Sequence, residues 1–205
     1  MKLANEAADM PRVTPLASDT LPADIALIYE RFASGYGSFG DQAAVLAHVP
    51  PALKHLYSML LELRERQAVP LRYIELAIVT VSKLNACPYC VAQHTPLLEI
   101  EGVDPNAVAA LPDANHPSLD ETDRLVVEYA TAVTQSAWRL PDEIFARLRA
   151  HFTESQIVEL TLRIALAGFF NRFNDALQID DGRAAAELAS HPIPNFGNQE
   201  RSHDD

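Results

Sequence analysis

Residues 71–102, LRYIELAIVTVSKLNACPYCVAQHTPLLEIEG, decide the fold of this chain. In the first part, 71–84, apolar residues recur at three- and four-residue spacings, and although β-branched residues are frequent, the length favours a helix over a strand. Residues 85–86 make a turn, Pro88 suits the first turn of a second helix, and Gly102 is typical of a helix end. The stretch therefore predicts a hairpin of two helices.

Helical periodicity continues on both sides of this hairpin, and no strand-turn-strand pattern interrupts it. The predicted helices cover about 21–34, 41–48, 52–66, 71–84, 88–101, 118–136, 141–150 and 153–177, with a connector at 103–117. Capping-box patterns at Ser118–Glu121 and Thr153–Gln156 mark two of the helix starts. We therefore expect an all-α fold with three parts: an N-terminal arm at 1–20, a helical domain at 21–180 and a C-terminal tail at 181–205.

The charge balance excludes some classes of partner. The chain has 28 acidic and 16 basic residues, a formal net charge of −12, whereas nucleic acids and anionic membrane surfaces attract basic faces. The first residues hold no continuous apolar stretch of the kind found in signal peptides, and no apolar run is long enough to span a membrane. We expect a cytoplasmic protein with no nucleic-acid or membrane partner.

The chain has only two cysteines, so no disulfide framework holds the fold. In a reducing compartment a close pair of this kind is typical of catalysis or metal binding. Cys87 falls at the cap position of the helix that Pro88 opens, and Cys90 falls in its first turn. Free N–H groups and the helix dipole stabilise a thiolate there, and the thiolate is the reactive form of cysteine.

Two further residues of the hairpin have the chemistry to move protons. His94 follows Cys90 by four residues and so lies on the same helix face, where a neutral imidazole can take a proton from a thiol and return it. In a hairpin, helical rise places Glu75 ~15 Å and His94 ~10 Å from the turn, an offset within side-chain reach. A carboxylate bonded to one ring nitrogen fixes the tautomer of the imidazole and raises the basicity of the other nitrogen. These residues predict a proton relay.

Four residues carry a resemblance to a known family: Glu75, Cys87, Cys90 and His94. Their spacing, E-x11-C-x2-C-x3-H, resembles that of the AhpD-like alkylhydroperoxidases of the carboxymuconolactone decarboxylase superfamily. Residues 40–180 look like the longer, peroxidase-related members, including IVEL at 157–160 and FNRFNDAL at 170–177. The chain departs from the type enzyme at Tyr89, where that enzyme carries a histidine between its cysteines.

The resemblance implies an all-α homo-oligomer, commonly a trimer or hexamer, with peroxidase activity that needs no metal or organic cofactor. It implies that Cys90 is the peroxidatic thiolate, oxidised to a sulfenic acid, and that Cys87 is the proton donor and resolving thiol. Glu75 and His94 would then form the proton relay. The implied partners are a hydroperoxide substrate and a dithiol reductant, which would be a lipoyl- or thioredoxin-like protein.

The same residues leave other functions open. A decarboxylase-type lyase would use His94 and Glu75 for proton transfer without the thiols. CPYC at 87–90 is also the glutaredoxin tetrapeptide, but since no sheet is predicted, general disulfide exchange would take place on the helical scaffold. The four residues could also bind zinc, although no second Cys or His pair accompanies them. A helical interaction protein with unreactive thiols is the remaining alternative. Among these, a thiol peroxidase fits the residues best.

Overall fold

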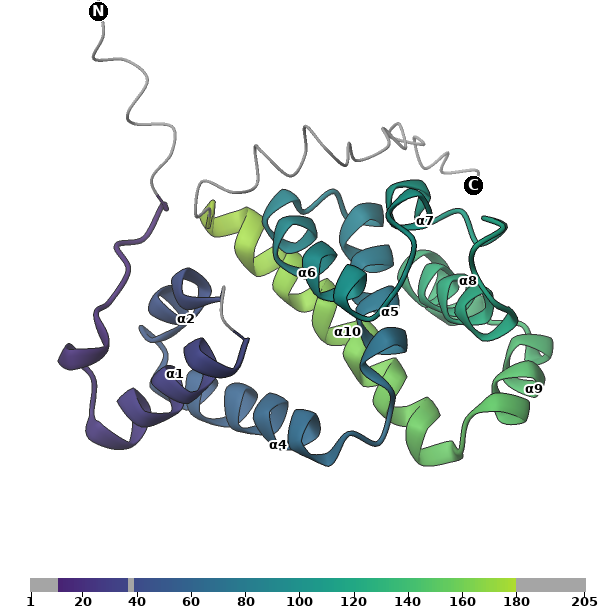
Figure 1. Ribbon diagram of the computed structural model, residues 1–205. Helices are drawn as coiled ribbons and strands as arrows, with labels where there is room; N and C mark the ends of the chain where they lie inside the picture. Colours follow the sequence, from purple (N-terminus) through teal and green to yellow (C-terminus); the bar gives the residue numbers. More distant parts are fainter. Residues whose placement is uncertain (1–10, 37–38, 180–205) are drawn as a thin grey trace, which may run out of the picture.

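The computed structural model describes residues 11–36 and 39–179, and every regular element within these ranges is a helix (Figure 1). The all-α prediction is confirmed. The main helices are α1 Ala23–Tyr36, α2 Gly40–Leu46, α3 Pro50–Ala52, α4 Ser58–Arg66, α5 Leu71–Leu84, α6 Pro88–Ile100, α7 Pro105–Ala110, α8 Glu121–Ser136, α9 Asp142–His151 and α10 Glu154–Leu177. Short helical turns add η1 Ser18–Thr20, η2 Leu53–Tyr57 and η3 Ala137–Arg139. The predicted tail at 181–205 lies outside the described residues, as does the predicted arm before residue 11.

Helices α5 and α6 form the hairpin that the sequence predicts. Cys87 is the N-cap residue of α6 and Pro88 its first residue, so the missing N–H of proline costs no helical hydrogen bond. Ala86 in the turn has a φ of 54°, and Gly102 after α6 has a φ of 80°, a left-handed conformation that glycine adopts without strain. Pro70 is the N-cap residue of α5, whose bounds agree with the predicted helix at 71–84.

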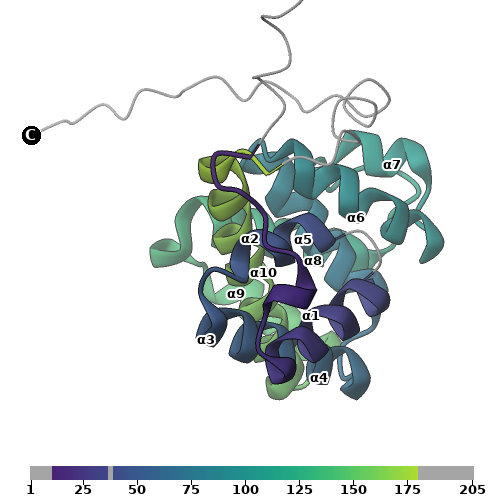
Figure 2. The same ribbon diagram turned by 90° about the vertical axis from the view of Figure 1, so that its left-hand side faces the viewer.

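Two hydrophobic clusters fill the interior, and α10 contributes to both. The larger cluster packs α5 to α10 together through residues such as Leu76, Leu98, Val126, Leu160 and Ile164. The second cluster joins α1, α2, η2 and α4 to the start of α6, and it contains Cys87 and Cys90. Figure 2 shows α1 to α4 in front of α5 and α10. The cysteines therefore lie where the N-terminal helices cover the hairpin.

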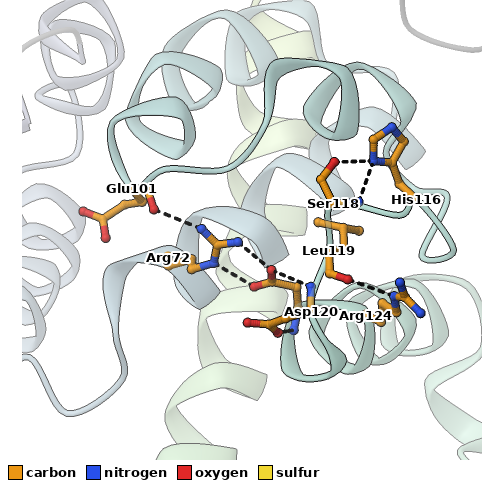
Figure 3. A network of polar contacts seen from close by, with 8 residues as sticks. Arg72, Glu101, His116, Ser118, Leu119, Asp120 and Arg124 are labelled. Carbon is orange, nitrogen blue, oxygen red and sulfur yellow. Dashed lines mark hydrogen bonds and ion pairs between the residues drawn. The ribbon is translucent and has the colours of Figure 1, made fainter.

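A buried ion pair joins α5, α6 and α8. Arg72 donates two hydrogen bonds to Asp123, from Nε to Oδ1 at 2.8 Å and from Nη2 to Oδ2 at 2.6 Å. Its Nη1 donates to the carbonyl oxygen of Glu101 at 3.1 Å, at the end of α6 (Figure 3). Asp123 is fully buried, and its hydrogen bonds to Arg72 raise the pKa of the guanidinium. The pair fixes the far end of the hairpin.

One predicted helix start is correct and another is not. Thr153 and Gln156 form the expected capping box at α10. The cap of α8 is Asp120 rather than Ser118, because Asp120 and Asp123 bond reciprocally to each other's backbone N–H groups. An aspartate at the third helical position closes this capping box as a glutamate does, so the prediction chose the wrong pair of residues.

Two other helices differ from the prediction. The predicted helix at 52–66 begins earlier, at Pro50, and it contains the π-helical turn η2, which no apolar spacing indicates. The connector at 103–117 holds one short helix, α7. None of the helices in the described ranges combines the length and apolar character needed to cross a membrane.

The described part of the N-terminal arm is fastened to the end of α10. The backbone N–H of Arg12 donates to the carbonyl oxygen of Leu177 at 2.9 Å, and its Nη1 donates to that of Ala176 at 2.9 Å. Arg12 Nε bonds Gln178 Oε1 at 3.0 Å. These bonds satisfy carbonyl groups that the end of a helix leaves without partners. Further along, Leu16 N–H donates to Ala44 at the end of α2.

Candidate functional site

The two cysteines meet at the N-terminus of α6, where they form a disulfide with a Cα–Cα distance of 5.4 Å. Cys87 is fully buried, and its Sγ accepts a hydrogen bond from the backbone N–H of Cys90 at 3.4 Å. Cys90 is 4% exposed. The sulfurs thus lie at the electropositive end of the helix, which is the position that the sequence predicts.

The helical hairpin also brings Glu75 and His94 together. His94 Nδ1 lies 2.7 Å from Glu75 Oε2, with the histidine on α6 and the carboxylate on α5. Both side chains are largely buried, at 14% and 8% exposure. The His94 ring packs against Phe39, with 4.9 Å between ring centroids. A carboxylate bound to Nδ1 leaves Nε2 as the nitrogen that can exchange protons.

A small pocket connects the thiol pair to this histidine. Cys90 and His94 both line it, together with the aromatic rings of Phe32, Phe39 and Phe170. Its volume is about 60 Å³, which is room for a few water-sized groups. Cys87 is not among the lining residues, so Cys90 is the sulfur that meets a molecule in the pocket.

A chain of buried amide and hydroxyl groups ends at the Cys90 sulfur. Tyr57 OH donates to Gln42 Oε1 at 3.0 Å, and Gln42 Nε2 donates to Asn174 Oδ1 at 3.0 Å. Asn174 Nδ2 donates to Cys90 Sγ at 3.2 Å. Sequence analysis missed all three residues as parts of the site. Asn174 lay within the quoted segment 170–177, but nothing in its local pattern pointed to a sulfur.

A second asparagine of α10 holds the pocket wall. Asn171 Nδ2 donates to Ser82 Oγ at 3.1 Å, and Asn171 Oδ1 accepts from Asn85 Nδ2 at 2.8 Å. Asn171 and Ser82 are buried and line the pocket. These bonds tie α10 to the end of α5, beside the turn that leads to the cysteines.

A buried charge pair also reaches the pocket. Arg163 and Glu159 lie four residues apart on α10, with Nη2 and Oε1 3.7 Å apart, and each is 5% exposed. Arg163 lines the pocket. Among residues 11–36 and 39–179, neither carboxylate oxygen of Glu159 finds a hydrogen-bond partner, nor does Arg163 Nε. The pair therefore places charge beside Cys90 and His94 without the hydrogen bonds that usually accompany burial.

Tyr89, which separates the cysteines, is 2% exposed, and its ring lies 6.4 Å from that of Phe39. It belongs to the packing around the site. Across residues 11–36 and 39–179, no group of three or more His, Cys, Asp or Glu side chains is arranged to hold a metal ion. The chemical groups of the site are the two cysteine sulfurs, the imidazole of His94 with the carboxylate of Glu75, and the amide of Asn174.

The fold and the site define a class: an all-helical protein with a Cys-x-x-Cys pair at a helix N-terminus beside a Glu–His pair. Sequence comparison agrees, because residues 50–117 match the sequence model of the carboxymuconolactone decarboxylase family. A curated relative, the uncharacterized protein YnjA of Escherichia coli (strain K12), is 29% identical over 132 residues, which are 63% of this chain and 72% of the relative.

Solved structures share the fold. A peroxidase-related protein from Ralstonia eutropha JMP134, described as an alkylhydroperoxidase AhpD core, superposes with a TM-score of 0.71 at 21% identity, over 90% of this chain and 98% of that one. The debrominase Bmp8 superposes with a TM-score of 0.70 at 22% identity, over 87% and 96% of the two chains. Residues 50–117 of this chain thus match the carboxymuconolactone decarboxylase family, and its fold is the one seen in AhpD-like proteins.

Proposed function

We propose that this protein is a thiol-dependent peroxidase that reduces small hydroperoxides through Cys87 and Cys90. One observation carries the proposal: Cys90 and His94 line the same small pocket, and Glu75 holds the other ring nitrogen of His94 at 2.7 Å. A nucleophile, a proton-exchanging base and a group that orients the base are the parts of an activated nucleophile. The pocket admits a small molecule beside them.

The first step consumes the peroxide. His94 takes the proton of Cys90, and the resulting thiolate attacks one oxygen of ROOH. A sulfur–oxygen bond forms and the O–O bond breaks, so that the sulfur loses two electrons to the peroxide. Cys87 gives its proton to the leaving alkoxide. The products are an alcohol and the Cys90 sulfenic acid.

The second step closes the disulfide. The Cys87 thiolate attacks the sulfenic sulfur, the S–S bond forms and hydroxide leaves, taking the proton that His94 holds. Two thiols and one hydroperoxide thus give one disulfide, one alcohol and one water. The 5.4 Å between the Cα atoms supports this step, because it lies within the range that a disulfide spans.

The reductant has to reach a buried disulfide. Cys87 is fully buried and Cys90 nearly so, so a cysteine on the face of a rigid protein has no direct path to either sulfur. A dithiol on a thin, flexible arm, such as a dihydrolipoyl group, fits this requirement better than a thioredoxin-like surface. The same burial argues against general disulfide exchange between proteins.

Two alternatives use the same pocket. A lyase of the decarboxylase type would need His94 and Glu75 but neither thiol. A reductive dehalogenase would need both thiols, and the structural likeness to a debrominase together with the aromatic pocket wall supports it as the second candidate. Activity towards peroxide or towards a bromopyrrole separates these reactions.

The proposal includes a homo-oligomer in a reducing compartment such as the cytoplasm. Val158, Leu162 and Phe169 leave an exposed apolar stripe along α10. Phe169 is 45% exposed in the single chain. Exposed apolar stripes of this kind are typical of association surfaces.

The test is stoichiometric. Reduced protein receives one equivalent of an organic hydroperoxide, and free thiols are counted in the wild type, Cys87→Ser and Cys90→Ser. We expect the wild type to lose both thiols and Cys87→Ser to hold a sulfenic acid that a dimedone-type reagent traps. Cys90→Ser should react at least about a hundredfold more slowly, since its remaining thiol does not line the pocket.

A third variant, Glu75→Gln, tests the proton relay, because it keeps the shape of the carboxylate and removes its charge. It retains both cysteines, and we expect their oxidation by the hydroperoxide to slow by about a hundredfold. Full retention of activity in Cys90→Ser, or a sulfenic acid trapped at Cys87 instead, contradicts the proposed roles. Bromopyrrole reduction without peroxide reduction supports the second candidate.

A further inference from the structure

We propose that Asn174 is a further catalytic residue, whose side-chain amide donates a hydrogen bond to Cys90 and stabilises its thiolate. Gln42 and Tyr57 hold this amide in its donating orientation. Cys90 is the reacting atom only if the proposed function is correct, but the effect of Asn174 on the Cys90 thiol is measurable without any peroxide.

The geometry consists of three hydrogen bonds in series, contributed by separate parts of the fold. Tyr57 belongs to the π-helical turn η2, Gln42 to α2 and Asn174 to the last turns of α10. The distances are 3.0 Å from Tyr57 to Gln42, 3.0 Å from Gln42 to Asn174 and 3.2 Å from Asn174 to the Cys90 sulfur. All three side chains are at most 3% exposed, so these bonds are shielded from bulk water, and Gln42 and Asn174 meet only the small pocket beside Cys90.

The donor-to-acceptor direction of these three hydrogen bonds follows from Tyr57, which stands farthest from the sulfur. Burial raises the pKa of Tyr57 well above its ordinary value, so the phenol keeps its proton and needs an acceptor. The phenol donates to Gln42 Oε1, which turns the side-chain NH₂ of Gln42 towards Asn174. Asn174 then presents its carbonyl to Gln42 and its amine to the sulfur. Reversing the chain would leave the buried phenolic proton without this acceptor, which is unfavourable.

A donated hydrogen bond favours the charged form of an acceptor. A thiolate accepts the Asn174 N–H bond strongly, whereas a neutral thiol accepts only weakly and has to turn its own proton elsewhere. The amide therefore lowers the pKa of the Cys90 thiol. Cys87 receives a different donor, the backbone N–H of Cys90 at 3.4 Å. Each sulfur of the pair thus has its own hydrogen-bond donor.

Other charged and titratable groups face the same sulfur. On α6 these are Cys87, which is bonded to it, and His94, which lines the pocket; on α5, Glu75 acts through His94. On α10, Arg163 lines the pocket, with Glu159 beside it. Tyr57 stands at the far end of the amide chain. Variants that keep Glu75, His94 and Arg163 in place leave these groups unchanged, so a shift in the pKa of Cys90 reports the effect of the amide chain.

The experiment measures the pKa of Cys90 in the full-length Cys87→Ser protein, from the rate of iodoacetamide alkylation against pH. Asn174→Ala should raise the midpoint and slow alkylation near pH 7 by about tenfold, which is the effect of one hydrogen bond to a charged group. Asn174→Asp has nearly the same size but places a carboxylate against the thiolate, so its midpoint should rise further.

Tyr57→Phe tests the chain at a distance from the sulfur. It keeps the aromatic packing and removes the proton that orients Gln42, and we expect alkylation to slow by about threefold because the amides lose their fixed direction. Tyr129→Phe is the matched control: Tyr129 is equally buried, and its hydroxyl lies 2.6 Å from Thr161 Oγ1 rather than in this chain. It should leave the midpoint unchanged.

The results separate this inference from the proposed function. An unchanged alkylation midpoint in folded Asn174→Ala overturns the inference about Asn174. A Tyr57→Phe effect no larger than that of Tyr129→Phe overturns it as well. If Asn174→Ala does not fold, Tyr57→Phe and Asn174→Asp decide the question. A shifted midpoint in a protein that consumes no hydroperoxide supports the role of Asn174 and rejects the peroxidase.

Discussion

Within the described part of the chain, two arginine–carboxylate pairs have a buried carboxylate, and their surroundings differ. Arg72 and Asp123 share two direct hydrogen bonds, and Asp123 also closes the capping box of α8. Arg163 and Glu159 lie 3.7 Å apart, and three of their polar atoms find no hydrogen-bond partner among the described residues. The first pair lies where α5, α6 and α8 join, and the second lies beside the pocket.

The difference separates a structural pair from one that belongs to the site. A fully bonded pair repays the cost of burial and fixes helix positions, whereas a pair without hydrogen bonds contributes little net stability. Such incompletely satisfied groups concentrate where a molecule is bound or transformed. One arginine–carboxylate pair thus plays a structural role at one end of α5, whereas in the other pair the arginine lines the pocket.

The largest effect is expected from Arg72→Met. The substitution leaves Asp123 buried without its guanidinium, and we expect the free energy of unfolding to fall by about 3–5 kcal/mol. Urea denaturation measures it. Arg147→Met is the control, because Arg147 bonds Glu128 in a half-exposed pair, and its loss should change stability by less than about 1 kcal/mol. If the two variants lose similar amounts of unfolding free energy, the Arg72–Asp123 pair contributes no more to stability than a half-exposed pair.

A smaller effect is expected when the second pair is replaced as a whole. In Glu159→Leu/Arg163→Met, two poorly bonded charges give way to apolar groups of similar volume, and the free energy of unfolding should stay within about 1 kcal/mol of wild type or rise. The same urea titration applies. A loss as large as that of Arg72→Met would show that this pair is structural after all.

The smallest effect concerns Asp175, next to Asn174. Burial raises the pKa of Asp175 from 3.8 to about 6 in the folded protein. The folded state therefore prefers the protonated acid, so stability falls as the pH rises from about 4 to about 6. Since this burial is only partial and solvent still reaches the side chain, screening keeps the loss below about 1 kcal/mol.

Asp175→Asn removes this penalty. The variant should melt at a slightly higher temperature than wild type near pH 7, and the difference should vanish near pH 3, below the pKa of the carboxyl in both the folded and the unfolded state. Differential scanning calorimetry at the two pH values measures it. A difference that persists at low pH means that the substitution acts through packing rather than through charge.

The hairpin was predictable because its signals are local. Pro88, Gly102 and the spacing of Cys87, Cys90 and His94 lie within one stretch of sequence, and helix geometry converts spacing into position. The contact between Glu75 and His94 needed only helical rise and a tight turn. Patterns of this kind also gave most of the helix bounds.

The amide chain was not predictable because its members are far apart in sequence. Gln42 and Asn174 are separated by 132 positions, and Asn174 and Cys90 by 84. No periodicity in α2 or α10 indicates which polar residue faces which, since that depends on how the two helices pack. Tyr57 lies in the π-helical turn η2, which no apolar spacing in the sequence indicates, so its bond to Gln42 was not predictable either.

The anchoring of the N-terminal arm by Arg12 links this arm to the end of α10 that carries Asn174. Arg12 binds the last turn of α10, and Asn174 lies in that same turn. Proteolytic clipping or a bulky affinity tag at this position disturbs the helix end that carries the sulfur's amide donor. Tag placement is therefore part of the design of any kinetic experiment on this protein.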